Sequence, residues 1–80
     1  MNKHILLVMK WLNNKESVSK EELAENRREA CSAATDANLV AAYNAAAAAT
    51  DYVAYAGSWV DKYFEITGED RNTYLKELEK

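Results

Sequence analysis

Residues 41–56 read AAYNAAAAATDYVAYA, a segment that holds nine of the fourteen alanines in the chain and neither proline nor glycine. Alanine is the best helix former, because its side chain loses no rotamer entropy when a helix forms. It also offers little surface to bury, so an alanine-rich helix is held by very close approach to a partner helix. The segment predicts an all-α protein, and it favours a binding or assembly module over an enzyme.

A regular pattern continues beyond this segment and predicts one long central helix from Leu39 to Ile66. Two apolar lines repeat every seven residues, as in a coiled coil: Leu39, Ala46, Val53 and Val60 on the first, and Ala42, Ala49, Ala56 and Tyr63 on the second. A polar line of Asn44, Asp51, Ser58 and Glu65 lies opposite them. We call the two apolar lines the alanine seam, and we expect Tyr52 and Trp59 to flank it and cover the alanines.

The remaining segments predict shorter helices around this one, giving a single domain, residues 1–80, of three to four helices. Apolar spacing indicates a first helix over Lys3–Asn13, which we expect to pack against the alanine helix. Ser19 and Glu22 have the spacing of a capping box at the start of a second helix, and the pattern breaks near Thr35–Ala37.

At the other end of the chain, Gly68 is a predicted C-terminal cap for the long helix. Thr67 is then expected to cap a last helix over Glu69–Glu79, with Asp70 as its capping-box partner. A chain of 80 residues with so much alanine buries a thin core, and self-association would add to its stability.

Charge and cysteine usage narrow the functional classes. The net charge is −3, with +3 over residues 1–20 and −6 over residues 21–80, so no basic stripe predicts nucleic-acid binding. The first apolar run is far shorter than the roughly 20 residues that span a bilayer, and we expect no membrane association. Cys31 is the only cysteine, which is typical of a reduced, cytoplasmic setting. We interpret it as a small buried residue, with a reactive thiol as the alternative.

The sequence contains few residues arranged as in known catalytic, cofactor-binding or metal-binding sites. His4 is the only histidine, and a capping or partly buried role suits it better than a catalytic one. We predict no catalytic residue, no cofactor and no metal ligand, and hence no enzymatic activity. Gly57 lies within the predicted long helix, where it is costly relative to alanine, and close backbone approach beneath Trp11 is the favoured explanation.

Tyr55 is the strongest candidate for a binding residue. Unlike the other aromatic residues of the long helix, it falls on the polar side, close to Asp51, Ser58 and Lys62. An exposed tyrosine on a rigid helix is typical of interface hot spots. We therefore predict a protein-binding surface composed of Asp51, Tyr55, Ser58 and Lys62.

Three stretches, MNKHILLVMKWLNN, AAYNAAAAATDYVAYA and WVDKYFEITGEDRNTYLKELEK, together resemble small alanine- and tyrosine-rich accessory proteins of tailed bacteriophages. Such proteins generally lack an assigned activity, so the resemblance implies a phage origin and a role in the cytoplasm of the infected bacterial cell. It supplies no site residue.

Two functional hypotheses follow. The first is a phage accessory protein that binds a host bacterial protein, for example as an inhibitor of host defence or metabolism. The second is a self-assembling structural module, a homo-oligomer without enzymatic activity, in which the alanine seam pairs between chains. The mass of the protein in solution distinguishes them.

Overall fold

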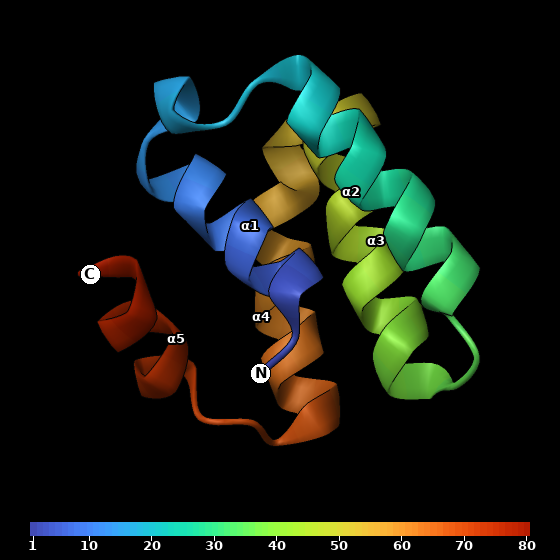
Figure 1. Ribbon diagram of the computed structural model, residues 1–80. Helices are drawn as coiled ribbons and strands as arrows, with labels where there is room; N and C mark the ends of the chain where they lie inside the picture. Colours follow the sequence, from blue (N-terminus) through green and yellow to red (C-terminus); the bar gives the residue numbers. More distant parts are fainter.

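The computed structural model describes residues 1–80, and its regular secondary structure is entirely helical (Figure 1). In chain order the elements are α1 (Lys3–Asn13), η1 (Lys15–Ser17), α2 (Lys20–Ala33), α3 (Ala37–Asp51), η2 (Val53–Tyr55), α4 (Ala56–Thr67) and α5 (Arg71–Leu78), where η denotes a single 3₁₀ turn. The predicted all-α class is confirmed. The predicted number of helices is wrong, because five α-helices are present rather than three or four.

Side-chain caps define where the first three helices begin. Asn2 caps α1, accepting hydrogen bonds from the amides of His4 and Ile5. The predicted capping box is confirmed, with the amide of Glu22 donating to Ser19 Oγ at 3.1 Å and the amide of Ser19 donating to Glu22 Oε1 at 3.2 Å. Asp36 caps α3, so the break predicted near Thr35–Ala37 is also present. These caps each satisfy amides that have no partner within the helix.

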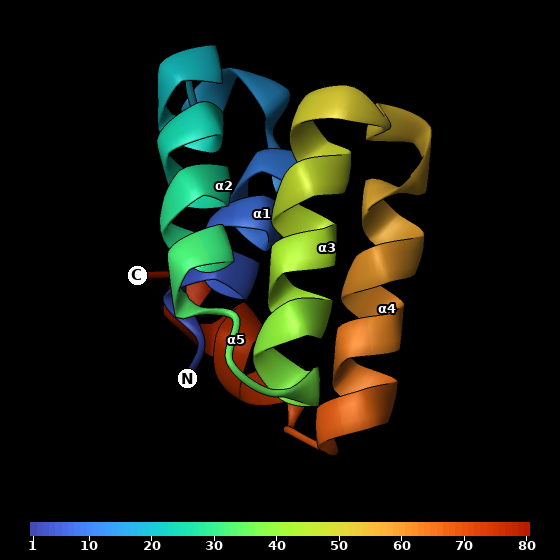
Figure 2. The ribbon, with the colours of Figure 1, turned by 90° about the vertical axis from the view of Figure 1, so that its right-hand side faces the viewer.

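The prediction of one long central helix is wrong. Helix α3 ends at Asp51, the chain turns through Val53–Tyr55, and α4 begins at Ala56. Figure 2 shows that α3 and α4 lie side by side as a hairpin, joined at one end by this turn. A continuous helix over residues 39–66 would measure about 42 Å. The whole molecule is only 29 Å along its longest principal axis.

Local chemistry explains why the helix stops at this point. Thr50 donates its hydroxyl to the carbonyl of Ala47 at 2.8 Å, which competes with the regular helical hydrogen bonds. Tyr52 then leaves the helical region, with φ −136° and ψ 58°. The β-branched Val53 also has low helix propensity. By folding back, the chain places the alanine seam of α3 against α4 rather than in water.

The C-terminal region combines a confirmed and a corrected prediction. Gly68 has φ +71° and caps α4, as predicted, because glycine adopts this left-handed conformation without steric cost. The capping box expected between Thr67 and Asp70 is not formed. Thr67 is the last residue of α4, and Asp70 itself caps α5 by accepting from the amide of Asn72 at 2.9 Å.

The core lies where α1 meets the layer formed by α2, α3 and α4 (Figures 1 and 2). Six alanines of α3 are buried: Ala41, Ala42, Ala45, Ala46, Ala48 and Ala49. They pack in one cluster with the larger side chains of α1, among which Ile5 and Val8 are fully buried. The predicted packing of the first helix against the alanine helix is therefore confirmed, and small side chains allow α3 to contact α1, α2 and α4 at once.

Candidate interaction surface

The turn between α3 and α4 carries an exposed apolar and aromatic surface, which we call the aromatic turn. It consists of Tyr52, Val53, Tyr55 and Trp59, with 66%, 49%, 61% and 36% of each residue exposed, respectively. Isolated apolar residues are common on protein surfaces, but a contiguous group is typical of an interaction site. Tyrosine and tryptophan are also the residue types most enriched in interface hot spots.

The aromatic turn is ordered by backbone hydrogen bonds. The amide of Tyr52 donates to the carbonyl of Ala48, and the amide of Tyr55 donates to the carbonyl of Tyr52, both at 2.8 Å. Ala49 and Ala56 are buried on either side of it and anchor the two helix ends in the core. Binding through this turn would therefore cost little backbone ordering.

The four residues predicted as a binding surface are all exposed, but they do not form the continuous stripe that one long helix would give. Asp51 ends α3 and forms an ion pair with Arg27 of α2 at 3.2 Å. Tyr55 lies in the turn, whereas Ser58 and Lys62 lie one helical turn apart on α4. Lys62 forms an ion pair with Glu65 at 3.8 Å. The four residues thus lie on three successive elements, and Asp51 lines a groove together with Tyr52 and Trp59.

Tyr52 and Trp59, which the sequence placed over the alanines, belong to the exposed surface instead. The prediction that these two side chains cover the alanines extends the seven-residue pattern through the turn. It is therefore wrong for the same reason as the prediction of one long helix. Both side chains line a groove of about 350 Å³ between α2, α3 and α4, next to the half-buried Tyr43. The groove extends the aromatic turn along α3.

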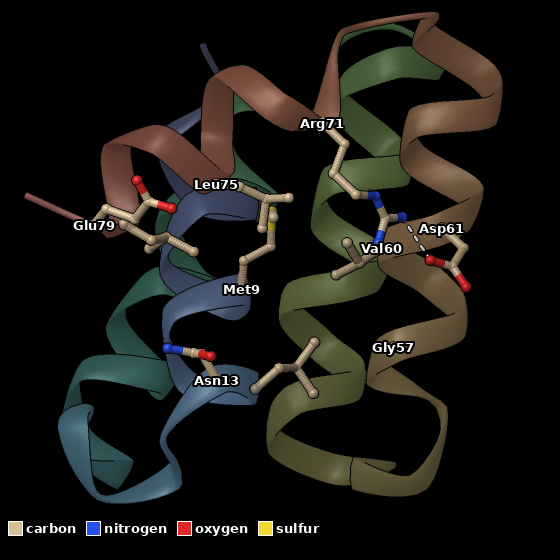
Figure 3. A pocket seen from close by; sticks show the side chains of 10 residues that line it. Met9, Asn13, Gly57, Val60, Asp61, Arg71, Leu75 and Glu79 are labelled. Carbon is tan, nitrogen blue, oxygen red and sulfur yellow. Dashed lines mark hydrogen bonds and ion pairs between the residues drawn. The ribbon is translucent and has the colours of Figure 1, made fainter.

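A larger groove of about 570 Å³ lies between α1, α4 and α5 (Figure 3). Its apolar lining consists of Met9, Leu12, Val60, Leu75 and Leu78. Arg71 reaches across its mouth from α5 to Asp61 of α4 at 2.5 Å, as Figure 3 shows. The guanidinium also lies 4.7 Å from the centre of the Phe64 ring, so Arg71 fastens α5 to α4.

Gly57 lines this groove, and its predicted close approach to another backbone is wrong. A Cβ atom built on Gly57 would meet no other atom within 4 Å. Its backbone lies in the first turn of α4 and has no positive φ. Neither packing nor backbone conformation therefore requires glycine at this position.

Buried hydroxyls join α4 and α5 through a shared carboxylate. Tyr63 donates to Glu69 Oε2 at 2.7 Å, and Tyr74 donates to Glu69 Oε1. Burial, followed by the hydrogen bond to Glu69, raises the pKa of both tyrosines, and that of Tyr63 strongly. The backbone amide of Asn2 donates to the Tyr74 hydroxyl at 2.7 Å, which ties α1 to the same group. This network holds the tyrosines in their protonated form and supports the fold.

His4 is buried in the structure, whereas Cys31 is exposed. His4 is buried, and its Nδ1 lies 2.7 Å from Asn26 Oδ1, while Asn26 Nδ2 donates to the His4 carbonyl at 3.2 Å. Because Asn26 Oδ1 can only accept, Nδ1 carries the proton, and the pair fastens α1 to α2. Cys31 is exposed near the end of α2, so its predicted burial among alanines is wrong. The turn of α2 that contains Cys31 points this side chain away from the buried Ala30.

No group of three or more histidine, cysteine, aspartate or glutamate side chains is arranged to hold a metal ion. No helix combines the length and the apolar character needed to cross a membrane. No protein-family model, curated protein or solved structure matches this chain. The surface of the molecule itself is therefore the basis for the functional proposal.

Proposed function

We propose that this protein acts by binding another protein through the aromatic turn, as an accessory protein of a tailed bacteriophage in the cytoplasm of the host cell. The exposure of Tyr52, Val53, Tyr55 and Trp59 on an ordered turn is the observation that supports this function. The phage setting rests on the sequence resemblance, and inhibition of a host defence or metabolic protein is the role that we propose for the complex.

Self-assembly is the second candidate function. It is suggested by the alanine seam, and this fold accounts for that seam in another way. Six alanines of α3, including the seam residues Ala42, Ala46 and Ala49, are buried within the same chain, whereas Val53 of the seam is exposed in the aromatic turn. Self-association would have to use another surface, and the aromatic turn is an exposed apolar candidate. A homo-oligomer formed through Tyr52 and Tyr55 is therefore one outcome of the same experiment.

The experiment begins with affinity capture from infected bacteria, using the wild-type protein and the Tyr52→Ala and Tyr55→Ala variants. A retained host protein is then purified, and its stoichiometry and Kd are measured. Loss of a hot-spot side chain costs about 2 kcal/mol or more, which corresponds to roughly 30-fold weaker binding. Each tyrosine variant is expected to show a loss of this size.

Ile66→Ala is the matched control, because Ile66 is an exposed apolar residue of α4 that lies outside the aromatic turn. Its Kd is expected to equal that of the wild type. Retention of the same partner with unchanged Kd by both tyrosine variants would disprove the assignment of the aromatic turn. Failure to retain any host protein would argue against the function itself.

A further inference from the structure

A second groove, with a volume of about 320 Å³, lies between α1 and α5. Three lysines, Lys3, Lys10 and Lys80, surround three leucines, Leu6, Leu7 and Leu78. We call this feature the basic groove. Its lining residues come from residues 3–10 and 77–80, so no single sequence segment contains the groove.

The basic groove has the opposite charge from the rest of the molecule. The whole chain has a net charge of −3, yet the lining of this groove contains three lysines and a single carboxylate, Glu77. Glu77 pairs with Lys80 at 3.1 Å, while Lys10 forms no ion pair. Lys3 is 3.9 Å from Glu29, and both side chains are more than half exposed. Such a pair contributes little, and Lys3 remains available to a partner.

Lys3, Leu6, Leu7 and Lys10 are spaced along one side of α1, with the two leucines between the two lysines. Residues seven apart in a helix are separated by about 10 Å along its axis. Leu6, Leu7 and Leu78 are each only partly buried against the core. The groove therefore offers an apolar floor between two positive charges at a defined separation.

We propose that the basic groove binds an acidic amphipathic helix of a partner protein. Two carboxylates seven residues apart would meet Lys3 and Lys10, and apolar side chains between them would cover the exposed parts of Leu6 and Leu7. A concave groove between two helices fits a rod-shaped segment better than a flat bilayer, and its leucine floor offers nothing to a chain of phosphates. This site is separate from the aromatic turn and does not depend on the function proposed for it.

A second copy of this chain does not provide a suitable segment. Its helix with the most carboxylates is α2, which carries Glu21, Glu22, Glu25 and Glu29 but also three basic residues. The apolar face of α2 is already used, because Leu23 and Ala30 are buried in its own core. Charge complementarity with an apolar stripe therefore requires a different protein.

The test uses a synthetic helical peptide of about 14 residues with Glu at positions i and i+7 and Leu at i+3 and i+4. A control peptide of the same composition places its Glu and Leu residues on opposite faces. Both are titrated into the ¹⁵N-labelled full chain and followed by NMR, and Kd is measured calorimetrically at low and high salt. The expected result is chemical-shift change in α1 and the last turn of α5, with binding that weakens at high salt.

Glutamine substitutions identify the contacts without removing packing groups. Lys3→Gln and Lys10→Gln are each expected to weaken binding of the first peptide about threefold, and the double variant about tenfold. Lys20→Gln is the control, because Lys20 is an exposed lysine of α2 outside the groove, and its Kd should match that of the wild type. Circular dichroism of each variant verifies the fold.

Four outcomes would overturn the proposal. They are the absence of binding by the first peptide, equal binding of the control peptide, chemical-shift changes confined to the aromatic turn, and unchanged Kd in the lysine double variant. Vesicles of phosphatidylglycerol and phosphatidylcholine are tested in parallel. Lysine-dependent binding to these vesicles without peptide binding would assign the groove to a membrane surface and would also overturn it.

Discussion

High pH is expected to destabilise this protein through two buried tyrosines. Tyr63 and Tyr74 are almost completely buried and both donate their hydroxyl protons to Glu69. Burial raises the pKa of each hydroxyl, and the neighbouring carboxylate adds to the effect because it disfavours a second negative charge. The folded state therefore keeps both protons at a pH where the unfolded chain releases them.

The direction and size of the effect follow from linkage. An unfolded tyrosine has a pKa of about 10, so the stabilisation is complete below about pH 10 and is lost as the pH rises above it. Tyr63, which stays protonated in the folded state at pH 11, then lowers the free energy of unfolding by about 1.4 kcal/mol, and Tyr74 adds a further loss in the same direction. A domain of this size has a total stability of about 4–12 kcal/mol, so the loss is readily measurable.

The assay is urea denaturation followed by far-UV circular dichroism between about pH 8 and about pH 11. Tyr63→Phe keeps the ring and removes one titrating hydroxyl, so its alkaline loss should be clearly smaller than that of the wild type. Tyr52→Phe is the matched control, because the Tyr52 hydroxyl has no partner and its side chain is exposed. A wild-type stability that does not fall over this range, or equal slopes for the two variants, would refute the role of the Glu69 network.

Three further predictions test the packing. Ala46→Leu inserts a large side chain at a fully buried position of α3 and should lower the free energy of unfolding by about 1–3 kcal/mol in urea denaturation. The control Ala37→Leu, at an exposed position of the same helix, should change the free energy of unfolding little. Equal effects of the two substitutions would contradict the close packing of α3. Gly57→Ala should stabilise the protein by roughly 0.5–1 kcal/mol, because the added methyl group meets open space, and a lower melting temperature would show an unrecognised constraint. Light scattering across a concentration series should give the mass of a monomer, since the alanines of α3 are buried within the chain; a stable oligomer would contradict this prediction and favour self-assembly through another surface.

The features predicted correctly from the sequence are those with local causes. The apolar spacing of Lys3–Asn13, the capping box of Ser19 with Glu22 and the left-handed Gly68 each act over only a few residues. Their chemistry is the same in the peptide and in the fold. Thr67 shows the limit of this approach, because both Thr67 and Asp70 are residue types that cap helices, and the structure uses Asp70.

The position of the α3–α4 turn could not be obtained from the seven-residue pattern. An apolar seam indicates only that a helix needs a partner, and it is equally compatible with a second chain, another helix, or its own continuation folded back. Thr50 and Val53 have lower helix propensity than alanine, but Val53 also fits the apolar line of a continuous helix. Missing this turn also misplaced Tyr52 and Trp59, the two residues that complete the exposed surface.

The remaining features depend on contacts between distant segments. The Tyr63–Glu69–Tyr74 network needs α5 to fold back onto α4, and the basic groove needs Lys80 to approach α1. Neither is encoded by local spacing. Tyr55 is predicted to be exposed because it falls on the polar side of the expected helix, and it is exposed even though that helix is broken.

The closure of the alanine seam within one chain is the central structural claim, because the aromatic turn exists only if α3 and α4 form a hairpin. Spin labels on Asn38→Cys and Glu65→Cys, in a Cys31→Ser background, measure this directly by pulsed electron paramagnetic resonance. All three positions are exposed, so the substitutions leave the core intact. The hairpin predicts a single distance distribution centred below about 25 Å, as expected for neighbouring helices. A distribution centred near 40 Å, the span of one continuous helix between these positions, would contradict it.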